Sequence, residues 1–176
     1  MGLLKKMRKR KSPPKPKPEP RYTHASPGDI IRLYANNERL IGSTIDDFFM
    51  MAKIALNRAF GFGQIRWNRI HRKMLLDLTC IGERYVTVKE INQALREEAD
   101  FGFNAPDRKH WTYERKVAAT VCDDMSSCFA LALLDEFGFK AKRIAKAYDM
   151  MGQIGNDLKT GKLSRKEFVR LASGGK

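Results

Sequence analysis

The amino-acid sequence repeats itself at an offset of 77 positions, and a segment that occurs twice is expected to fold twice in the same way. Without any gap, Asp46-Asp47 aligns with Asp123-Asp124, and Phe60-Gly61-Phe62 aligns with Phe137-Gly138-Phe139. Of the 49 pairs from 46/123 to 94/171, 11 are identical, whereas ordinary residue frequencies would give about three. The sequence therefore predicts a tandem duplicated unit.

Each unit has the apolar periodicity of three helices. In the first unit, Ser43 or Thr44 is expected to cap a helix whose apolar side chains recur every three or four residues. The glycines of Phe60-Gly61-Phe62-Gly63 would end that helix, because glycine readily adopts the left-handed conformation of a C-cap. A second helix follows, and Thr87 with Glu90 is expected to begin a short third helix as a capping box.

The second unit repeats this plan. It has a long apolar helix before Phe137-Gly138-Phe139, a second helix after it, and Ser164 with Glu167 at the start of the last helix. Ahead of both units, Ser26-Pro27-Gly28-Asp29 predicts the start of a helix that runs to about Asn37, because proline is favoured in the first helical turn. No stretch alternates in the manner of a β-strand. We therefore expect an all-α fold.

The expected organisation has three parts. Residues 1–25 form a disordered basic arm rich in lysine and proline, residues 26–100 form the first helical unit, and residues 101–176 form the second. The two units are expected to pack together as one helical bundle. A third Phe-Gly-Phe, at Phe101-Gly102-Phe103, lies in the connector. We expect the rings of all three copies to plug the core at corners between helices, with stacking on nucleobases as the alternative.

Positive charge is concentrated at the N-terminus. The net charge is +14, and residues 1–20 contribute half of it, with eight basic residues against the single acid Glu19. Five of the seven prolines also lie there, so we expect an extended arm that binds phosphates and releases their counterions. A solubilising tail without a specific partner is the alternative. The candidate ligands of nucleic acid in the arm are Lys5, Lys6, Arg8, Lys9, Arg10 and Lys11.

A second basic cluster runs from Lys53 to Lys73, where six basic residues occur without an acid. Arg66, Arg69 and Lys73 are spaced to share one face of the second helix. We expect this face to bind phosphates, with a solvated surface or an acidic protein partner as the alternatives. The candidate residues in this cluster are Arg58, Arg66, Trp67, Arg69, Arg72 and Lys73.

The matching face of the second unit is weaker in charge. It keeps Arg143 and Lys146 at the positions equivalent to Arg66 and Arg69, but it adds Asp149. We therefore expect the first unit to bind nucleic acid and the second to be structural or to dimerise, which leaves a homo-oligomer open.

The corner motif resembles one found in small helical proteins of phages and prophages of Gram-positive bacteria. In those proteins an apolar helix ends in acid–acid–x-Phe-Gly-Phe-Gly, a basic helix follows, and a Gly-Tyr-Val-Ser-like cap starts a short last helix. Here the motif is carried by Leu134 to Phe139 with Arg143, and by Phe60-Gly61-Phe62-Gly63 with Tyr85 to Ile91. The resemblance covers 46–95 and 123–172, in two copies where such proteins usually have one. It implies a viral or prophage origin and brings no catalytic residues with it.

Few groups in the sequence could carry out a reaction. Asp46-Asp47 and Asp123-Asp124 could bind a divalent metal from facing helices, but we interpret them as first-turn carboxylates that the helix dipole stabilises. The segment from Asn156 to Glu167 lacks the ligands of a calcium loop. Cys122 and Cys128 do not have the spacing of zinc ligands. We expect no enzymatic activity, no metal and no cofactor.

These observations predict a non-enzymatic, phage-encoded accessory protein that binds the phosphate backbone of DNA or RNA through the basic arm and the basic helix. The alternative is an interaction or inhibitor protein that binds an acidic surface of a host or viral protein complex. We expect no membrane partner, and a phage protein of this kind would act in the cytoplasm of the bacterial host.

Overall fold

A computed structural model describes residues 27–103 and 107–174, and the side chains from residue 37 onward. The described residues from 35 onward form one compact unit, and the described residues 27–34, at the start of the first helix, belong to a separate one. The described residues consist of helices and loops without a strand, and the helices pack into a bundle. The expected all-α class is therefore confirmed. The basic arm lies outside the described residues.

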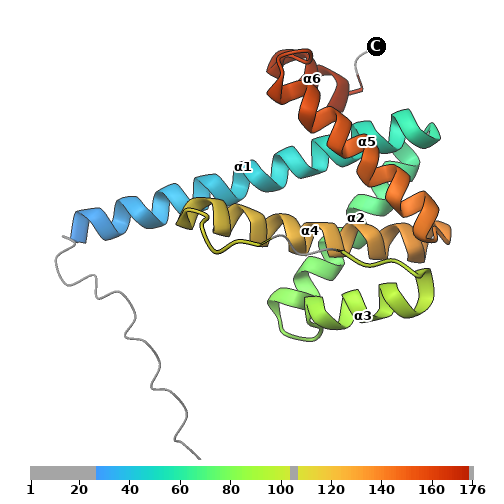
Figure 1. The fold of residues 1–176 in the computed structure, drawn as a ribbon, viewed down its shortest axis with the longest axis horizontal. Helices are drawn as coiled ribbons and strands as arrows, with labels where there is room; N and C mark the ends of the chain where they lie inside the picture. The colour runs from blue at the N-terminus through green and yellow to red at the C-terminus, as the bar shows by residue number, and fades with distance from the viewer. Residues whose placement is uncertain (1–26, 104–106, 175–176) are drawn as a thin grey trace, which may run out of the picture. The chain divides into compact units, whose positions relative to one another are not determined.

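Six helices are present in the described part of the chain (Figure 1). Both α2 and α3 pack against α4. The helices are α1 (Pro27–Phe60), α2 (Gln64–Gly82), α3 (Val88–Ala99), α4 (Tyr113–Phe137), α5 (Ala141–Lys159) and α6 (Arg165–Ala172).

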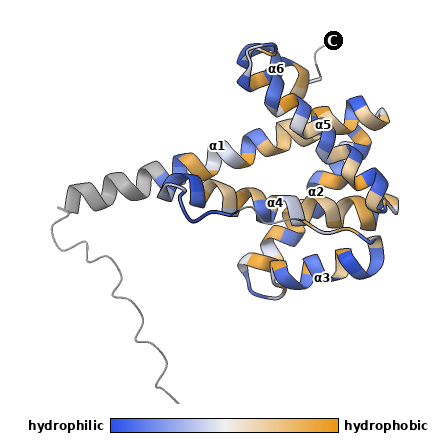
Figure 2. Ribbon diagram, in the orientation of Figure 1, coloured by the Kyte–Doolittle hydropathy of each residue, from blue (hydrophilic) through white to orange (hydrophobic). Residues whose placement is uncertain are grey.

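The core of the compact unit is centred on α4. Met125, Phe129 and Leu133 of this helix are almost completely buried, and Phe48 of α1 meets Phe129 edge to face with ring centroids 6.0 Å apart. Hydrophobic and hydrophilic stretches alternate along the helices, as expected of amphipathic helices that bury one face (Figure 2). Burial of this apolar surface is the main force that holds the helices together.

By length and composition alone, α4 is also apolar enough to cross a membrane. The same composition is expected of a helix at the centre of a soluble core, and α4 is packed by α2 and α3 in this structure. The packing of α4 in the bundle accounts for its apolar character.

The first helix is longer than expected. Ser43 and Thr44 do not cap a new helix, because α1 continues through them from Pro27 to Phe60. The Ser43 hydroxyl donates to the Leu40 carbonyl at 3.0 Å, and the Thr44 hydroxyl donates to the same carbonyl at 2.7 Å. Bonds of this kind to the preceding turn let serine and threonine remain inside a helix. The predicted break at this position is wrong.

The caps of the short helices agree with the sequence. Thr87 accepts a hydrogen bond from the Glu90 amide, and the Glu90 carboxylate accepts one from the Thr87 amide, which completes the predicted capping box of α3. Ser164 accepts a hydrogen bond from the Glu167 amide at the start of α6. Both predicted helix starts are therefore confirmed.

Local backbone geometry recurs at the offset of 77 residues. Gly61 and Gly138 adopt φ angles of 64° and 62° at the ends of α1 and α4, and α2 and α5 begin three residues later in each case. Arg84 and Gly161 occupy matching positions with φ angles of 61° and 76°. The tandem duplication itself stays a prediction from the sequence.

The third Phe-Gly-Phe forms a corner of a different kind. The left-handed residue at the end of α3 is Asp100, with a φ angle of 52°. Phe101 and Phe103 are half-buried against the core, and their rings lie 5.9 and 5.4 Å from the ring of Tyr148. The expected role of these rings as core plugs is confirmed.

Candidate nucleic-acid interface

The first and second Phe-Gly-Phe corners, residues 60–63 and 137–140, lie at the same end of the bundle (Figure 1). Their rings pack directly on one another. The centroids of Phe60 and Phe139 are 4.9 Å apart, and those of Phe62 and Phe137 are 4.8 Å apart. The glycine in each corner turns the chain so that both rings of that corner reach the other one.

These ring contacts obey an approximate two-fold symmetry. Exchanging each residue with the one 77 positions away turns the Phe60–Phe139 contact into the Phe137–Phe62 contact, and the two interplanar angles are 57° and 53°. The same exchange turns the Phe62–Phe139 pair, whose ring centroids are 6.0 Å apart, into itself. The two-fold axis therefore passes between Phe62 and Phe139.

Cations lie over the rings in the same symmetric pattern. The guanidinium carbon of Arg66 is 5.5 Å from the centroid of Phe62, and that of Arg143 is 5.4 Å from the centroid of Phe139. A cation over an aromatic face is attracted by the ring quadrupole. Both guanidinium groups are therefore held at the corner while their side chains stay exposed to solvent.

A second pair of cations follows the same symmetry. Arg69 lies 4.9 Å from the centroid of Phe137, and Lys146 lies 5.2 Å from the centroid of Phe60. Each also donates to the backbone carbonyl of the residue that precedes its ring, at 3.2 Å in both cases. Residues far apart in the sequence thus form matched contacts on either side of the axis.

A hollow of about 530 Å³ opens at this axis. Its floor is aromatic, its other lining residues are cationic, and no acid lines it. Such a surface favours an anionic ligand. The lining residues are Phe60, Phe62, Arg66, Phe137, Phe139, Arg143 and Lys146.

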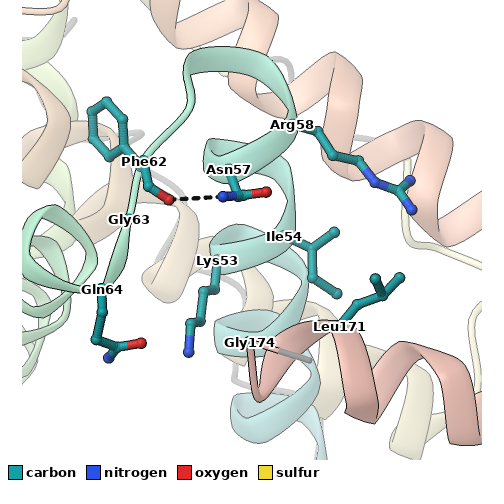
Figure 3. Close-up of a pocket in the computed structure, with 9 residues that line it drawn as sticks. All are labelled: Lys53, Ile54, Asn57, Arg58, Phe62, Gly63, Gln64, Leu171 and Gly174. Atoms are coloured by element: carbon teal, nitrogen blue, oxygen red, sulfur yellow. Dashed lines mark hydrogen bonds between the residues drawn. The ribbon is translucent and has the colours of Figure 1, made fainter. Parts of the chain in front are cut away.

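A second hollow, of about 520 Å³, adjoins the first because Phe62 lines both. Lys53 and Arg58 of α1 and Gln64 of α2 surround it, again without an acid (Figure 3). Asn57 donates to the Phe62 carbonyl at 3.1 Å and holds the corner against α1. This hollow extends the cationic surface along one side of the two-fold axis.

A third hollow, of about 430 Å³, adjoins the first on the other side, where Arg143 lines both. It is formed mainly by the start of α5, with Lys140 and Lys142 beside Arg143, and it includes one acid, Asp100. Lys140 donates to the Glu98 carbonyl. Each of the three hollows is thus lined by at least two basic side chains.

Seven basic side chains around these hollows lack acidic partners. In the part of the chain that the structure describes, none of them has a carboxylate oxygen within 4.0 Å of a charged nitrogen. Their charge is therefore available to a ligand. We call them the corner cations: Lys53, Arg58, Arg66, Lys140, Lys142, Arg143 and Lys146.

Two cations of the predicted stripe on α2 are paired with acids instead. Arg69 donates through Nε to Glu136 at 2.8 Å, and Lys73 Nζ lies 2.8 Å from Asp77 and 3.0 Å from Asp135. Burial alone would lower the pKa of Lys73, but the hydrogen bonds to the two carboxylates raise it above its usual value. These side chains tie α2 to α4 and have less charge to offer a ligand.

The other sequence-predicted residues are divided between core and surface. Trp67 is buried, with 7% of its surface exposed, and packs edge to face on Phe49 at 6.3 Å. It is therefore not available to a nucleobase. Arg72 is exposed on α2 and lines none of the three hollows. The arm residues Lys5 to Lys11 lie outside the described residues.

The structure brings together residues that the sequence interpretation kept apart. Arg143 and Lys146 of the second unit share one hollow with Arg66 of the first. Sequence reasoning ranked their helix face as weaker because of Asp149, which lines none of the hollows. The repeat was the signal that could have found them, since symmetric units often pack through equivalent surfaces.

The Asp doublets lie inside helices rather than in their first turns, so the helix-dipole interpretation is wrong. Asp46-Asp47 falls within the long α1, and Asp123-Asp124 falls within α4. Ion pairs account for one member of each doublet, since Arg165 pairs with Asp47 and Arg108 pairs with Asp123. Among the described residues, no group of three His, Cys, Asp or Glu side chains is placed to hold a metal ion.

The cysteines are free thiols, and two of them are poor candidates for nucleophiles. Burial raises the pKa of Cys128 to about 12, and burial together with the nearby Asp123 carboxylate raises the pKa of Cys122. Because the thiolate is the reactive form, both thiols stay largely unreactive at neutral pH.

Comparison with known proteins adds no family to these observations, since no protein-family model, curated protein or solved structure matches the chain. The resemblance of the corner motif to phage proteins therefore stays a prediction.

Proposed function

We propose that this protein binds nucleic acid without catalysing a reaction, through contacts with the phosphate backbone. The observation that carries the proposal is the set of seven corner cations, which lie around adjoining hollows without acidic partners among the described residues. Surface cations of a folded protein are commonly accompanied by acids, as Arg69 and Lys73 are here. A basic surface without such neutralisation attracts polyanions.

Arginine chemistry supports phosphate as the ligand group. Arg58, Arg66 and Arg143 present planar guanidinium groups, which can form two parallel hydrogen bonds with phosphate oxygens. A phenyl ring under the guanidinium leaves the N–H groups at its edge free to donate. Because Arg66 and Arg143 are already held over their rings, they lose less side-chain entropy when they bind.

The basic arm is expected to add to this surface. Its candidate residues Lys5 to Lys11 lie outside the described residues, so their part in binding rests on the sequence alone. The resemblance of the corner motif supports a phage or prophage origin, which would place the protein in the cytoplasm of a bacterial host.

Fluorescence anisotropy with labelled DNA and RNA, at about 50 to 300 mM salt, tests the proposal. Contacts with six to eight phosphates should give a log–log salt slope near −6 for B-DNA. A full-length variant in which the six candidate lysines and arginines of the arm are changed to glutamine should show a shallower slope and weaker binding.

Absence of binding at the lowest salt would overturn the proposal. Affinity capture would then be directed at the alternative partner, an acidic surface of a host or viral protein complex. Such a partner would bind the corner cations too, so variants at Arg66 and Arg143 would serve both experiments.

A further inference from the structure

We infer that the nucleic acid is double-stranded and is bound on a local two-fold axis, so that Arg66 of α2 contacts one strand and Arg143 of α5 contacts the other. This inference rests on the proposed function and specifies its substrate class. It follows from the symmetry of the site, from the span between the two arginines and from the accessibility of the aromatic rings.

The first step is the symmetry of the charges. Arg66 and Arg143 lie over equivalent rings at 5.5 and 5.4 Å, on opposite sides of the axis between Phe62 and Phe139. The two antiparallel strands of a duplex are also related by two-fold axes, which run perpendicular to the helix. A two-fold protein surface and a duplex can therefore share one axis, and pairs of phosphates from the two strands then meet equivalent side chains.

The second step is the span. The distances of 5.5 Å from Arg66 Cζ to one ring, 6.0 Å between the rings and 5.4 Å from the other ring to Arg143 Cζ place the two Cζ atoms at most about 17 Å apart. The minor and major grooves of B-DNA are about 6 and 12 Å wide. The two arginines are therefore close enough to contact the backbones on both sides of a single groove.

The third step is the accessibility of the rings. Proteins that bind single strands usually stack the bases on exposed aromatic side chains. Here Phe62 and Phe139 are only 6% and 5% exposed, Phe60 and Phe137 are half-buried, and all four rings of the two corners have a cation near one face. Trp67 is buried as well. This surface thus offers charge for phosphates and no free platform for bases, which favours a duplex over a single strand.

The test measures binding of the full-length protein to a duplex DNA, to a duplex RNA and to the single strands of the same sequence. We expect both Arg66→Ala and Arg143→Ala to weaken duplex binding about five- to tenfold at about 100 mM salt, each by losing one phosphate contact. Each should lower the magnitude of the salt slope by about 1, and the double variant by about 2. Comparison of the affinities for the DNA and RNA duplexes shows whether a B-form or an A-form helix binds more tightly on the two-fold axis.

A matched control is available on the third helices of the two units. Lys89 and Lys166 are also equivalent under the repeat, are exposed and line none of the three hollows. The double variant Lys89→Ala/Lys166→Ala removes the same charge as Arg66→Ala/Arg143→Ala and should have a much smaller effect. Thermal unfolding of each variant verifies that it is folded, and Arg66→Lys should restore most of the lost affinity.

The outcomes separate this inference from the proposed function. Binding of single strands as tightly as duplexes, or an Arg143→Ala variant with unchanged duplex affinity, would overturn the two-fold mode while leaving nucleic-acid binding in place. Equal losses in the control variant would overturn it as well. Binding to no nucleic acid would overturn both.

Discussion

At the scale of single residues, Lys73 contributes more to the stability of the bundle than a surface lysine usually does. Its ammonium group forms ion pairs with two carboxylates, that of the buried Asp77 and that of Asp135. Burial raises the pKa of Asp77 above its usual value despite the hydrogen bond from Lys73. The second carboxylate oxygen of Asp77 is buried and has no hydrogen-bond partner among the described residues. The ammonium group is therefore what makes a charged Asp77 tolerable inside the bundle.

Replacing Lys73 with methionine should destabilise the protein by about 2 kcal/mol at neutral pH, because it leaves a buried charge uncompensated. A carboxyl group with a raised pKa in the folded state favours folding at low pH and loses that contribution as the pH rises through the folded pKa. The loss in the variant should thus be smaller near pH 4.5 than near pH 7. Urea unfolding at both pH values measures it.

The neighbouring Arg72→Met is the control for Lys73→Met, since Arg72 is exposed and has no acidic partner in the described part of the chain. It should change the free energy of unfolding by no more than about 0.5 kcal/mol at either pH. A pH-independent loss in Lys73→Met would show that Asp77 is not the source of the destabilisation.

The backbone of Arg84 is strained, whereas the backbone of the equivalent residue in the second unit is not. Arg84 has a φ angle of 61°, and the matching position of the second unit holds Gly161. Backbone strain in this conformation destabilises the folded state by about 1 to 2 kcal/mol for a residue other than glycine. Glycine avoids the strain, but it loses more conformational entropy on folding, which offsets part of the gain. Arg84→Gly should therefore stabilise the protein by about 0.5 kcal/mol. Glu83→Gly, at a φ of −80°, should destabilise it, and thermal unfolding distinguishes the two.

At the scale of helices, the sequence predicted where a helix ends more accurately than where a helix continues without a break. The glycine corners and the caps at Thr87 and Ser164 were found because each relies on one local interaction. The unbroken α1 was missed because Ser43 and Thr44 satisfy their hydroxyls in either arrangement. A residue that can cap a helix or bond within it gives no local signal, and tertiary packing decides between the two.

The end of α4 offers a test of this local control. Gly138 has a φ angle of 62°, and a Cβ there would meet no neighbouring atom, so Gly138→Ala should cost about 1 kcal/mol from backbone strain alone. Gly152 lies inside α5 with equally open space and no positive φ. Gly152→Ala should instead stabilise by about 0.5 to 1 kcal/mol. Opposite signs in denaturant unfolding are expected, and equal signs would contradict the assignment.

At the scale of the whole molecule, the helical class could be predicted but the site only in part. Periodicity reports which face of each helix is apolar, and this was enough to predict that the helices would pack into a bundle. The periodicity does not indicate which of the Phe-Gly-Phe corners pack against each other. Arg66 and Arg143 line the same hollow only because two corners separated by 77 residues pack together, and ion pairs such as Arg69–Glu136 depend on the same long-range arrangement.

The packing of two corners from one chain has a further consequence. A hollow built between two separate subunits is lost on dilution, once the concentration falls below the dissociation constant of the pair. Here both walls belong to one chain and are joined through the folded helices α2, α3 and α4, so their contact does not depend on the protein concentration. The hollow at Phe62 and Phe139 is consequently present in every folded molecule, even at the few copies per cell where a dimeric site would fall apart.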